Sequence, residues 1–269
     1  FRATLAPLDP RALAAKPLPG QQAAAEDLRR RLAGSLLWQP GAARRLQDPL
    51  SLRNVVQIHG AAQRALAQAE EVVTIEINGA SDNPVVDTAA GEVLPTGAYY
   101  AAELALACET ASRAFLGLAM AQVARIARLL DPRFSDLPPF LARPATDSNG
   151  FAPLMKTAEA LVAEIAHAAQ PPAIWPSLNA LGVEDALSTG PIAARALGQV
   201  AEHAARLAAL ELIVAAQAVD LRGCAGALGP AMADCHARVR ALSPPLEKDR
   251  PLPDDLDRVT QAVLADDFA

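Results

Sequence analysis

Aromatic side chains and cysteine are both scarce in this sequence. Only 4% of its 269 residues are aromatic although 52% are hydrophobic. The apolar content is mostly alanine, leucine and valine, and such small or straight-chain residues favour closely packed helices. The three cysteines lack metal-type spacing, and an odd number fits a reduced, cytoplasmic protein better than a secreted one. The composition therefore predicts a helical protein with one large or two modest domains.

Basic stripes and long hydrophobic runs are also missing. The net charge is -6 and the pI about 5.3, which argues against a nucleic-acid partner. The longest apolar stretch, Leu207 to Val219, is too short to span a bilayer and contains Glu211, so no membrane partner is expected. The sequence begins at Phe1, and no signal-peptide pattern follows.

Helical periodicity and capping residues divide the chain into helices joined by proline-rich loops. The segment up to Gly20 is expected to be loop-like. Helices are predicted at 21–32, 49–71, 100–130, 151–170, 184–228, 231–242 and 252–269. Residues 72–77 are β-branched and alternating, which predicts a short extended segment, and 87–95 predicts a small hairpin around Gly91. The fold class is therefore all-α, a bundle of long antiparallel helices with a short hairpin-like insertion.

The stretch from Leu46 to Arg53 is the most specific local pattern. Asp48 is a good N-cap and Pro49 suits a first helical position. Arg53 would then lie in the second turn, beside a helix N-terminus that attracts anions. A guanidinium in that place can hold a small carboxylate through two hydrogen bonds. The alternative is an ordinary capped helix with a surface arginine.

Four motifs, in order along the chain, resemble the histidine and phenylalanine ammonia-lyase family. The first matches its Gln-Asp-x-Tyr-Ser-Leu-Arg motif, the second its Glu-x-Asn and Ser-Asp-Asn-Pro turn, the third its Gly-Gly-Asn-Phe-His, and the fourth the Gln-Glu-Asp of histidine-type enzymes. They are Gln47-Asp48-Pro49-Leu50-Ser51-Leu52-Arg53, Glu76-Ile77-Asn78 with Ser81-Asp82-Asn83-Pro84, Thr96-Gly97-Ala98-Tyr99-Tyr100, and Val183-Glu184-Asp185. The resemblance covers essentially the whole chain.

The resemblance implies a carbon–nitrogen lyase built as a homotetramer of long helices, with a bundle of the ammonia-lyase and fumarase type. In this family an electrophilic methylidene-imidazolone, formed from an Ala-Ser-Gly tripeptide, takes the substrate amine. Loss of a β-proton and of ammonia then gives an α,β-unsaturated acid. The Gly-Ser-Ser signature of the fumarase and aspartase enzymes is absent from this sequence.

The Ala-Ser-Gly tripeptide is absent as well. Family members are roughly twice as long and carry that loop in their first half, so the resemblance assigns residues 1–269 to the C-terminal helical-bundle half. The expectation is that this chain alone does not eliminate ammonia. Its expected partners are a small amino-acid substrate and either further copies of itself or a chain that carries the N-terminal half.

The resemblance assigns roles to four residues. Arg53 matches the arginine that holds the substrate carboxylate, Gln47 a glutamine that reaches the site, and Tyr99 an aromatic residue that covers the pocket. Glu184 matches the glutamate of histidine-type enzymes, a catalytic residue that can hydrogen-bond an imidazole or take a proton, and it favours histidine as substrate. The alternatives are a structural salt bridge for Arg53, a plain loop residue for Gln47, a core tyrosine, and a first-turn helix acid for Glu184.

Three motif positions depart from the family pattern towards apolar side chains. Leu50 replaces a tyrosine, Ala98 an asparagine and Val183 a glutamine. Leucine neither donates nor accepts a hydrogen bond. The changes keep a second hypothesis open, a non-catalytic homologue that acts as an amino-acid-binding or oligomerisation scaffold. No His or Cys pair has metal-ligand spacing, so no metal is expected.

Overall fold

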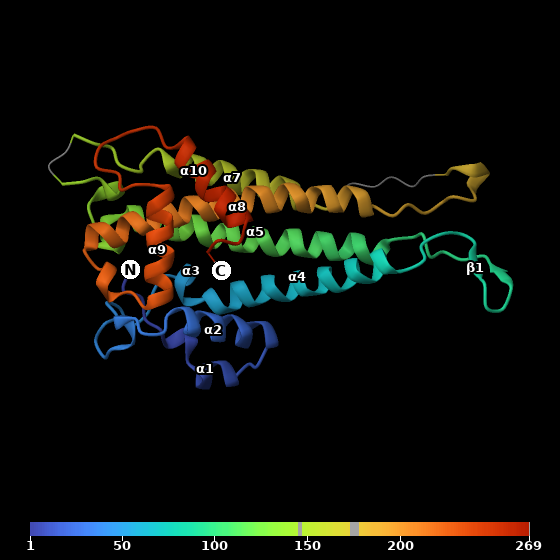
Figure 1. Cartoon of the computed structure of the whole chain (residues 1–269), viewed down its shortest axis with the longest axis horizontal. Coiled ribbons are helices and arrows are strands. Elements are labelled where there is room, and N and C mark those ends of the chain that lie inside the picture. Colours follow the sequence, from blue (N-terminus) through green and yellow to red (C-terminus); the bar gives the residue numbers. More distant parts are fainter. Residues whose placement is uncertain (145–146, 173–177, 269) are drawn as a thin grey trace.

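The computed structural model describes residues 1–144, 147–172 and 178–268, and it confirms the helical fold class (Figure 1). The described residues form ten α-helices and a single two-stranded sheet. The helices are α1 (Pro10–Ala14), α2 (Pro19–Arg31), α3 (Leu50–Arg53), α4 (Val55–Asn78), α5 (Ala102–Leu130), α6 (Pro132–Ser135), α7 (Leu154–Ala168), α8 (Gly190–Arg222), α9 (Pro230–Leu242) and α10 (Pro253–Leu264); the strands are β1 (Val85–Asp87) and β2 (Glu92–Leu94).

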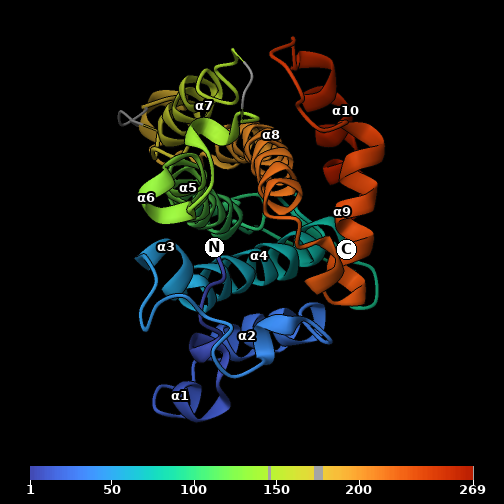
Figure 2. The ribbon, with the colours of Figure 1, turned by 90° about the vertical axis from the view of Figure 1, so that its left-hand side faces the viewer.

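Four long helices, α4, α5, α7 and α8, run alternately up and down and form the bundle (Figure 1). Helix α5 packs against each of the other three. Ala111 and Ala119 on α5 are fully buried, and their small side chains let the neighbouring helices approach closely. Seen along the helices, α2 covers α4, while α9 and α10 lie beside α8 (Figure 2).

Helix α5 is the one described helix that is long and apolar enough, by length and composition alone, to cross a membrane. Its packing accounts for that character. Ile126 is fully buried, and Leu129 and Leu130 are nearly so, within the main hydrophobic core. Part of the apolar surface of α5 is thus used in contacts with α4, α7 and α8, while Leu106 and Met120 stay exposed.

The start of the helix predicted at 49–71 needs correction. Asp48 does not cap a helix, because Oδ2 accepts a hydrogen bond from the backbone N–H of Thr4 at 2.7 Å. The long helix is also interrupted at Asn54, so Arg53 ends the one-turn helix α3 and precedes α4. A backbone donor brought in by the N-terminal segment, which periodicity cannot reveal, takes the carboxylate away from the helix start.

The extended segment predicted at 72–77 is wrong, since α4 continues through it to Asn78. Val72 is buried against Ala107 and Ala111 of α5, and the Thr74 hydroxyl donates to the Glu70 carbonyl at 2.7 Å. Tertiary packing of one face therefore overrides the modest helix propensity of β-branched residues.

Two further predictions concern the loops. The hairpin around Gly91 is confirmed, although its first strand begins at Val85, before the predicted 87–95. Val85 lies opposite Leu94, and Gly91 has the left-handed conformation that the turn requires. The loop-like first segment is wrong in part, because it contains α1, where the Asp9 carboxylate accepts from the Arg11 N–H at 2.8 Å.

Candidate active site

Arg53 and Gln47, both predicted from the first motif, lie side by side. The Arg53 Nη1 donates to Gln47 Oε1 at 3.0 Å. Arg53 forms no ion pair with any residue in the described part of the chain. Arg53 therefore does not form a structural salt bridge, which was the alternative interpretation. Most of its guanidinium N–H donors are left for another group.

These two residues line an open depression of about 470 Å³. Its wall combines the N-terminal segment, the start of α2 and the α3–α4 junction. The lining residues are Thr4, Ala6, Pro7, Ala12, Leu13, Lys16, Gln21, Leu46, Gln47, Arg53, Asn54 and Gln57. Two cations and four side-chain amides face this space, and no carboxylate does. An anion fits such a lining.

Contacts far apart in sequence build this depression. Asp48 is only 6% exposed, and its bond to the Thr4 N–H ties the N-terminal segment to the motif. Just before the motif, Arg44 Nη1 donates to the Phe134 and Ser135 carbonyls at 3.1 Å, and Arg45 Nη2 donates to the Phe134 carbonyl at 2.9 Å. These bonds fasten the residues just before the motif to helix α6, which follows α5.

Lys16 and Gln57 also line the depression, and the sequence analysis had marked neither of them. Gln57 lies on α4, four residues after Arg53. A helical projection from the motif would have placed the two residues on the same face. Lys16 lies in the proline-rich connection between α1 and α2, where no local pattern marks it. Only the folding of α1 and α2 against α4 brings it to Arg53.

Tyr99 and Glu184 lie elsewhere. Both belong to connections at the end of the bundle that carries β1, whereas α3 lies towards the other end of α4 (Figure 1). The 24 residues of α4 alone extend about 36 Å at 1.5 Å per residue. Within one chain these two residues therefore do not meet Arg53 and Gln47. Tyr99 is 60% exposed, so core packing does not account for it.

Glu184 does not open the longest helix, as the sequence had predicted. Helix α8 begins at Gly190, and Glu184 instead pairs through its backbone with Asn179, whose N–H donates to the Glu184 carbonyl at 3.0 Å. Pro191 sets this start, because proline lacks an N–H and fits only the first turn of a helix. The same helix ends at Arg222 because Gly223 takes a left-handed C-cap conformation.

The three apolar departures lie at the surface. Leu50 is largely exposed on α3, and Ala98 and Val183 are exposed at the β1 end of the bundle. Their side chains offer no hydrogen bond at positions where the family pattern has polar groups. Within the described residues no group of three or more His, Cys, Asp and Glu side chains is placed to hold a metal ion.

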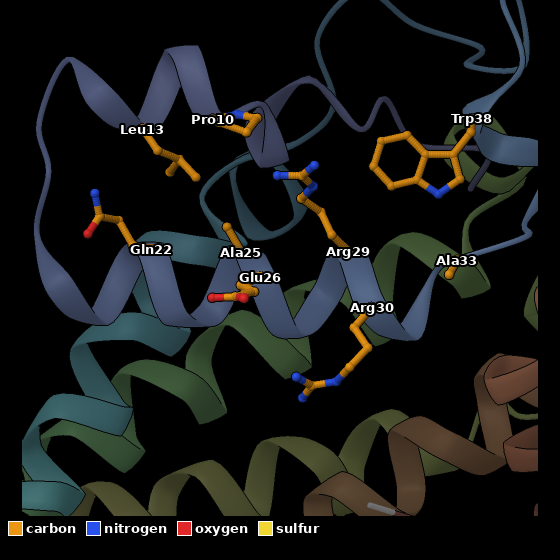
Figure 3. A pocket seen from close by; sticks show the side chains of 9 residues that line it. All are labelled: Pro10, Leu13, Gln22, Ala25, Glu26, Arg29, Arg30, Ala33 and Trp38. Atoms are coloured by element: carbon orange, nitrogen blue, oxygen red, sulfur yellow. The ribbon is translucent and has the colours of Figure 1, made fainter.

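A larger depression, of about 880 Å³, lies between α1 and α2. Arg29 points towards Pro10 and Trp38 there, while Arg30 points the other way (Figure 3). None of the predicted site residues lines this space. The Arg53 depression is therefore the candidate site because of its lining and not because of its volume.

Comparisons with known proteins agree with the motifs. A family model described as aromatic amino acid lyase matches residues 1–241. Histidine ammonia-lyase from Anaeromyxobacter sp. (strain K) is 38% identical over 262 residues, which is 96% of this chain and 51% of that protein. The chain thus spans about half the length of the curated relatives it matches.

Solved structures show the same architecture. Ergothionase from Treponema denticola superposes with a TM-score of 0.92 at 26% identity, covering 99% of this chain and 54% of that one. Phenylalanine aminomutase from Pantoea agglomerans gives 0.90 at 26%, covering 98% and 55%. With this fold, the motifs at Arg53 and Glu184, and the matching family model, the chain belongs to the aromatic amino acid lyase family.

Proposed function

We propose that this chain supplies the substrate-carboxylate side of an ammonia-lyase that acts on an aromatic amino acid, with histidine favoured. The observation that carries the proposal is the depression at Arg53, where Arg53 and Lys16 face an open space with no carboxylate in its lining. Arg53 is held by a neutral amide, Gln47, so its charge is left for a ligand. A planar fork of N–H donors matches a carboxylate.

The reaction also needs the methylidene-imidazolone group that the family resemblance implies, an electrophile for the substrate amine. This chain has no Ala-Ser-Gly tripeptide from which to form it, and Leu50, near where the group is expected, cannot form a hydrogen bond to it. The group therefore does not fit this chain's own residues. We propose that the loop comes from an N-terminal half and that this chain alone is inactive.

Assembly is part of the proposal, because Arg53 and Glu184 lie far apart in one chain. A tetramer in which the β1 end of one subunit meets the Arg53 depression of another would bring Tyr99 and Glu184 to the carboxylate site. Exposed apolar side chains at that end, including Ile77 and Val183, support such an interface. The three cysteines are unpaired, which supports a reducing, cytoplasmic location.

The binding test is calorimetric titration of the chain with L-histidine and L-phenylalanine. We expect binding to the wild type and at least about tenfold weaker binding by Arg53→Gln, because a hydrogen bond to a charged group contributes about 1.5–3 kcal/mol. Arg64→Gln is the matched control, an exposed arginine on α4 outside the depression. Equal affinities of Arg53→Gln and wild type would refute the carboxylate site.

A second experiment separates the lyase from a non-catalytic, amino-acid-binding homologue, which the apolar Leu50 favours. The chain is combined with a polypeptide that carries an Ala-Ser-Gly loop, and the absorbance of an unsaturated acid is followed after L-histidine or L-phenylalanine is added. Product formation supports the lyase. Binding without product supports the scaffold that retains only the carboxylate site.

A further inference from the structure

A mostly buried ion pair joins the two central helices close to the predicted carboxylate site. Arg125 on α5 donates from Nε to Glu211 Oε1 at 2.5 Å and from Nη2 to Glu211 Oε2 at 3.0 Å. The two side chains are only 11% and 19% exposed. Glu211 belongs to α8, so the pair fixes the guanidinium plane between two helices of the bundle core.

The remaining nitrogen of the same guanidinium, Nη1, contacts a different helix. Arg125 Nη1 donates to the Ser51 carbonyl at 3.2 Å. Ser51 lies in α3, two residues before Arg53. Helix α3 is a single turn of four residues with no side-chain cap. A helix of that length is not stable by itself in water. Its place in the fold must come from tertiary contacts such as this one.

We propose that Arg125, oriented by Glu211, is a positioning residue for Arg53. Two N–H donors bind the carboxylate of α8 and one binds the backbone of α3, so the bundle core sets where the Arg53 guanidinium points. Gln47 completes the arrangement from the other side through its bond to Arg53. This inference rests on the proposed carboxylate role of Arg53, which Arg125 itself does not share.

The discriminating variant is Arg125→Lys. Lysine keeps the charge and can still pair with Glu211, but a single ammonium lacks the fork that reaches both the carboxylate and Ser51. We expect calorimetric Kd for L-histidine to rise about tenfold. We also expect hydrogen exchange to accelerate about tenfold at the amides of Leu52, Arg53 and Asn54, which bond within α3.

A second variant tests whether the effects of Arg125→Lys come only from a folding defect. Glu211→Gln keeps the size of the side chain but leaves Arg125 without its carboxylate, and it should shift Kd and the α3 exchange in the same direction. Arg206→Gln is the control, since Arg206 on α8 pairs with Asp257 at 2.8 Å on the exposed side. It should leave the Kd and the exchange of the three amides unchanged.

The outcomes separate the two proposals. If wild type binds L-histidine and Arg53→Gln does not, but Arg125→Lys matches wild type in both Kd and α3 exchange, the positioning role is overturned. Faster exchange in Arg125→Lys that is spread evenly over the bundle, with a matching fall in Tm, also overturns it. If wild type binds no amino acid, the proposed function fails, and faster exchange confined to α3 still supports Arg125 as the residue that places Arg53.

Discussion

His59 shows how a single residue depends on charges from three helices. It lies on α4, and burial lowers the pKa of its imidazole below the ordinary 6.5, with the nearby Arg125 lowering it further. Glu211 and Asp27 act in the opposite direction without reversing the shift. The neighbouring Arg125–Glu211 pair was not visible in the sequence.

This shift predicts a pH-dependent stability. Below pH 6.5 the unfolded chain binds a proton at His59 that the folded chain resists, so the free energy of unfolding should fall as pH drops through that range. The contribution is fully present above pH 6.5. Urea denaturation of wild type and His59→Gln between pH 7.5 and 5.5 measures it.

If His59 is responsible, the free energy of unfolding should fall more between pH 7.5 and 5.5 in wild type than in His59→Gln. His167→Gln is the control, because that histidine is exposed on α7. Parallel pH profiles for wild type and His59→Gln would contradict the prediction.

At the scale of elements, the approach of α2 to α4 shapes the wall of the Arg53 depression. Gly60 on α4 faces Gly20 on α2, where a Cβ added to Gly60 would lie 2.5 Å from the Gly20 carbonyl carbon and 2.6 Å from the Gln21 nitrogen. Both neighbours are backbone atoms that no rotamer change can move. Lys16 and Gln21 line the depression at this same end of α2, so its geometry depends on two glycines.

Gly60→Ala should therefore destabilise the chain by about 1–3 kcal/mol through overpacking, and it should weaken amino-acid binding by displacing Lys16 and Gln21. Gly198→Ala is the matched control, because nothing lies within 4 Å of a Cβ at that helical position. A gain of roughly 0.5–1 kcal/mol is expected there. Thermal or urea denaturation measures the stability of both variants. Equal effects of the two substitutions would refute the requirement for glycine where α2 and α4 meet.

At the scale of the whole molecule, many exposed apolar side chains lie at the β1 end of the bundle. The β1 end carries large apolar side chains on α4, on the hairpin and in the connections before α5 and α8. They are Ile75, Ile77, Val86, Val93, Tyr99, Leu178, Leu181 and Val183. Ile77 is 75% exposed and Val183 81%. Exposed apolar side chains gathered in one part of a molecule are typical of protein–protein interfaces.

We therefore expect the chain to associate with itself through this end. Sedimentation at several concentrations should show assembly, and Ile77→Asp combined with Val183→Asp should weaken it at least about tenfold, because a buried charge without a partner disrupts an apolar interface. Leu264→Asp, an exposed apolar position on α10, is the control. A wild type that stays monomeric at high concentration would contradict the assembly.

The local sequence determined most of the secondary structure. Apolar periodicity located the long helices and Gly91 located the hairpin, since these signals act between residues a few positions apart. Helix ends were located less well: the longest helix was predicted at 184–228 and runs from Gly190 to Arg222. Gln47 and Arg53 could be paired from the sequence because both lie in one short motif. Their assignment to a substrate carboxylate, and that of Tyr99 and Glu184 to the same site, stays a prediction.

Only the tertiary structure decided the rest. Asp48 bonds to Thr4 instead of capping a helix, residues 72–77 join α4 because Val72 packs on α5, and Lys16 reaches the Arg53 depression from a separate helix connection. Arg125 reaches Ser51 across a sequence distance of 74 residues. The physical reason is common to all four: each depends on a partner brought close by packing of the bundle, and no periodicity in the chain encodes which distant group will arrive.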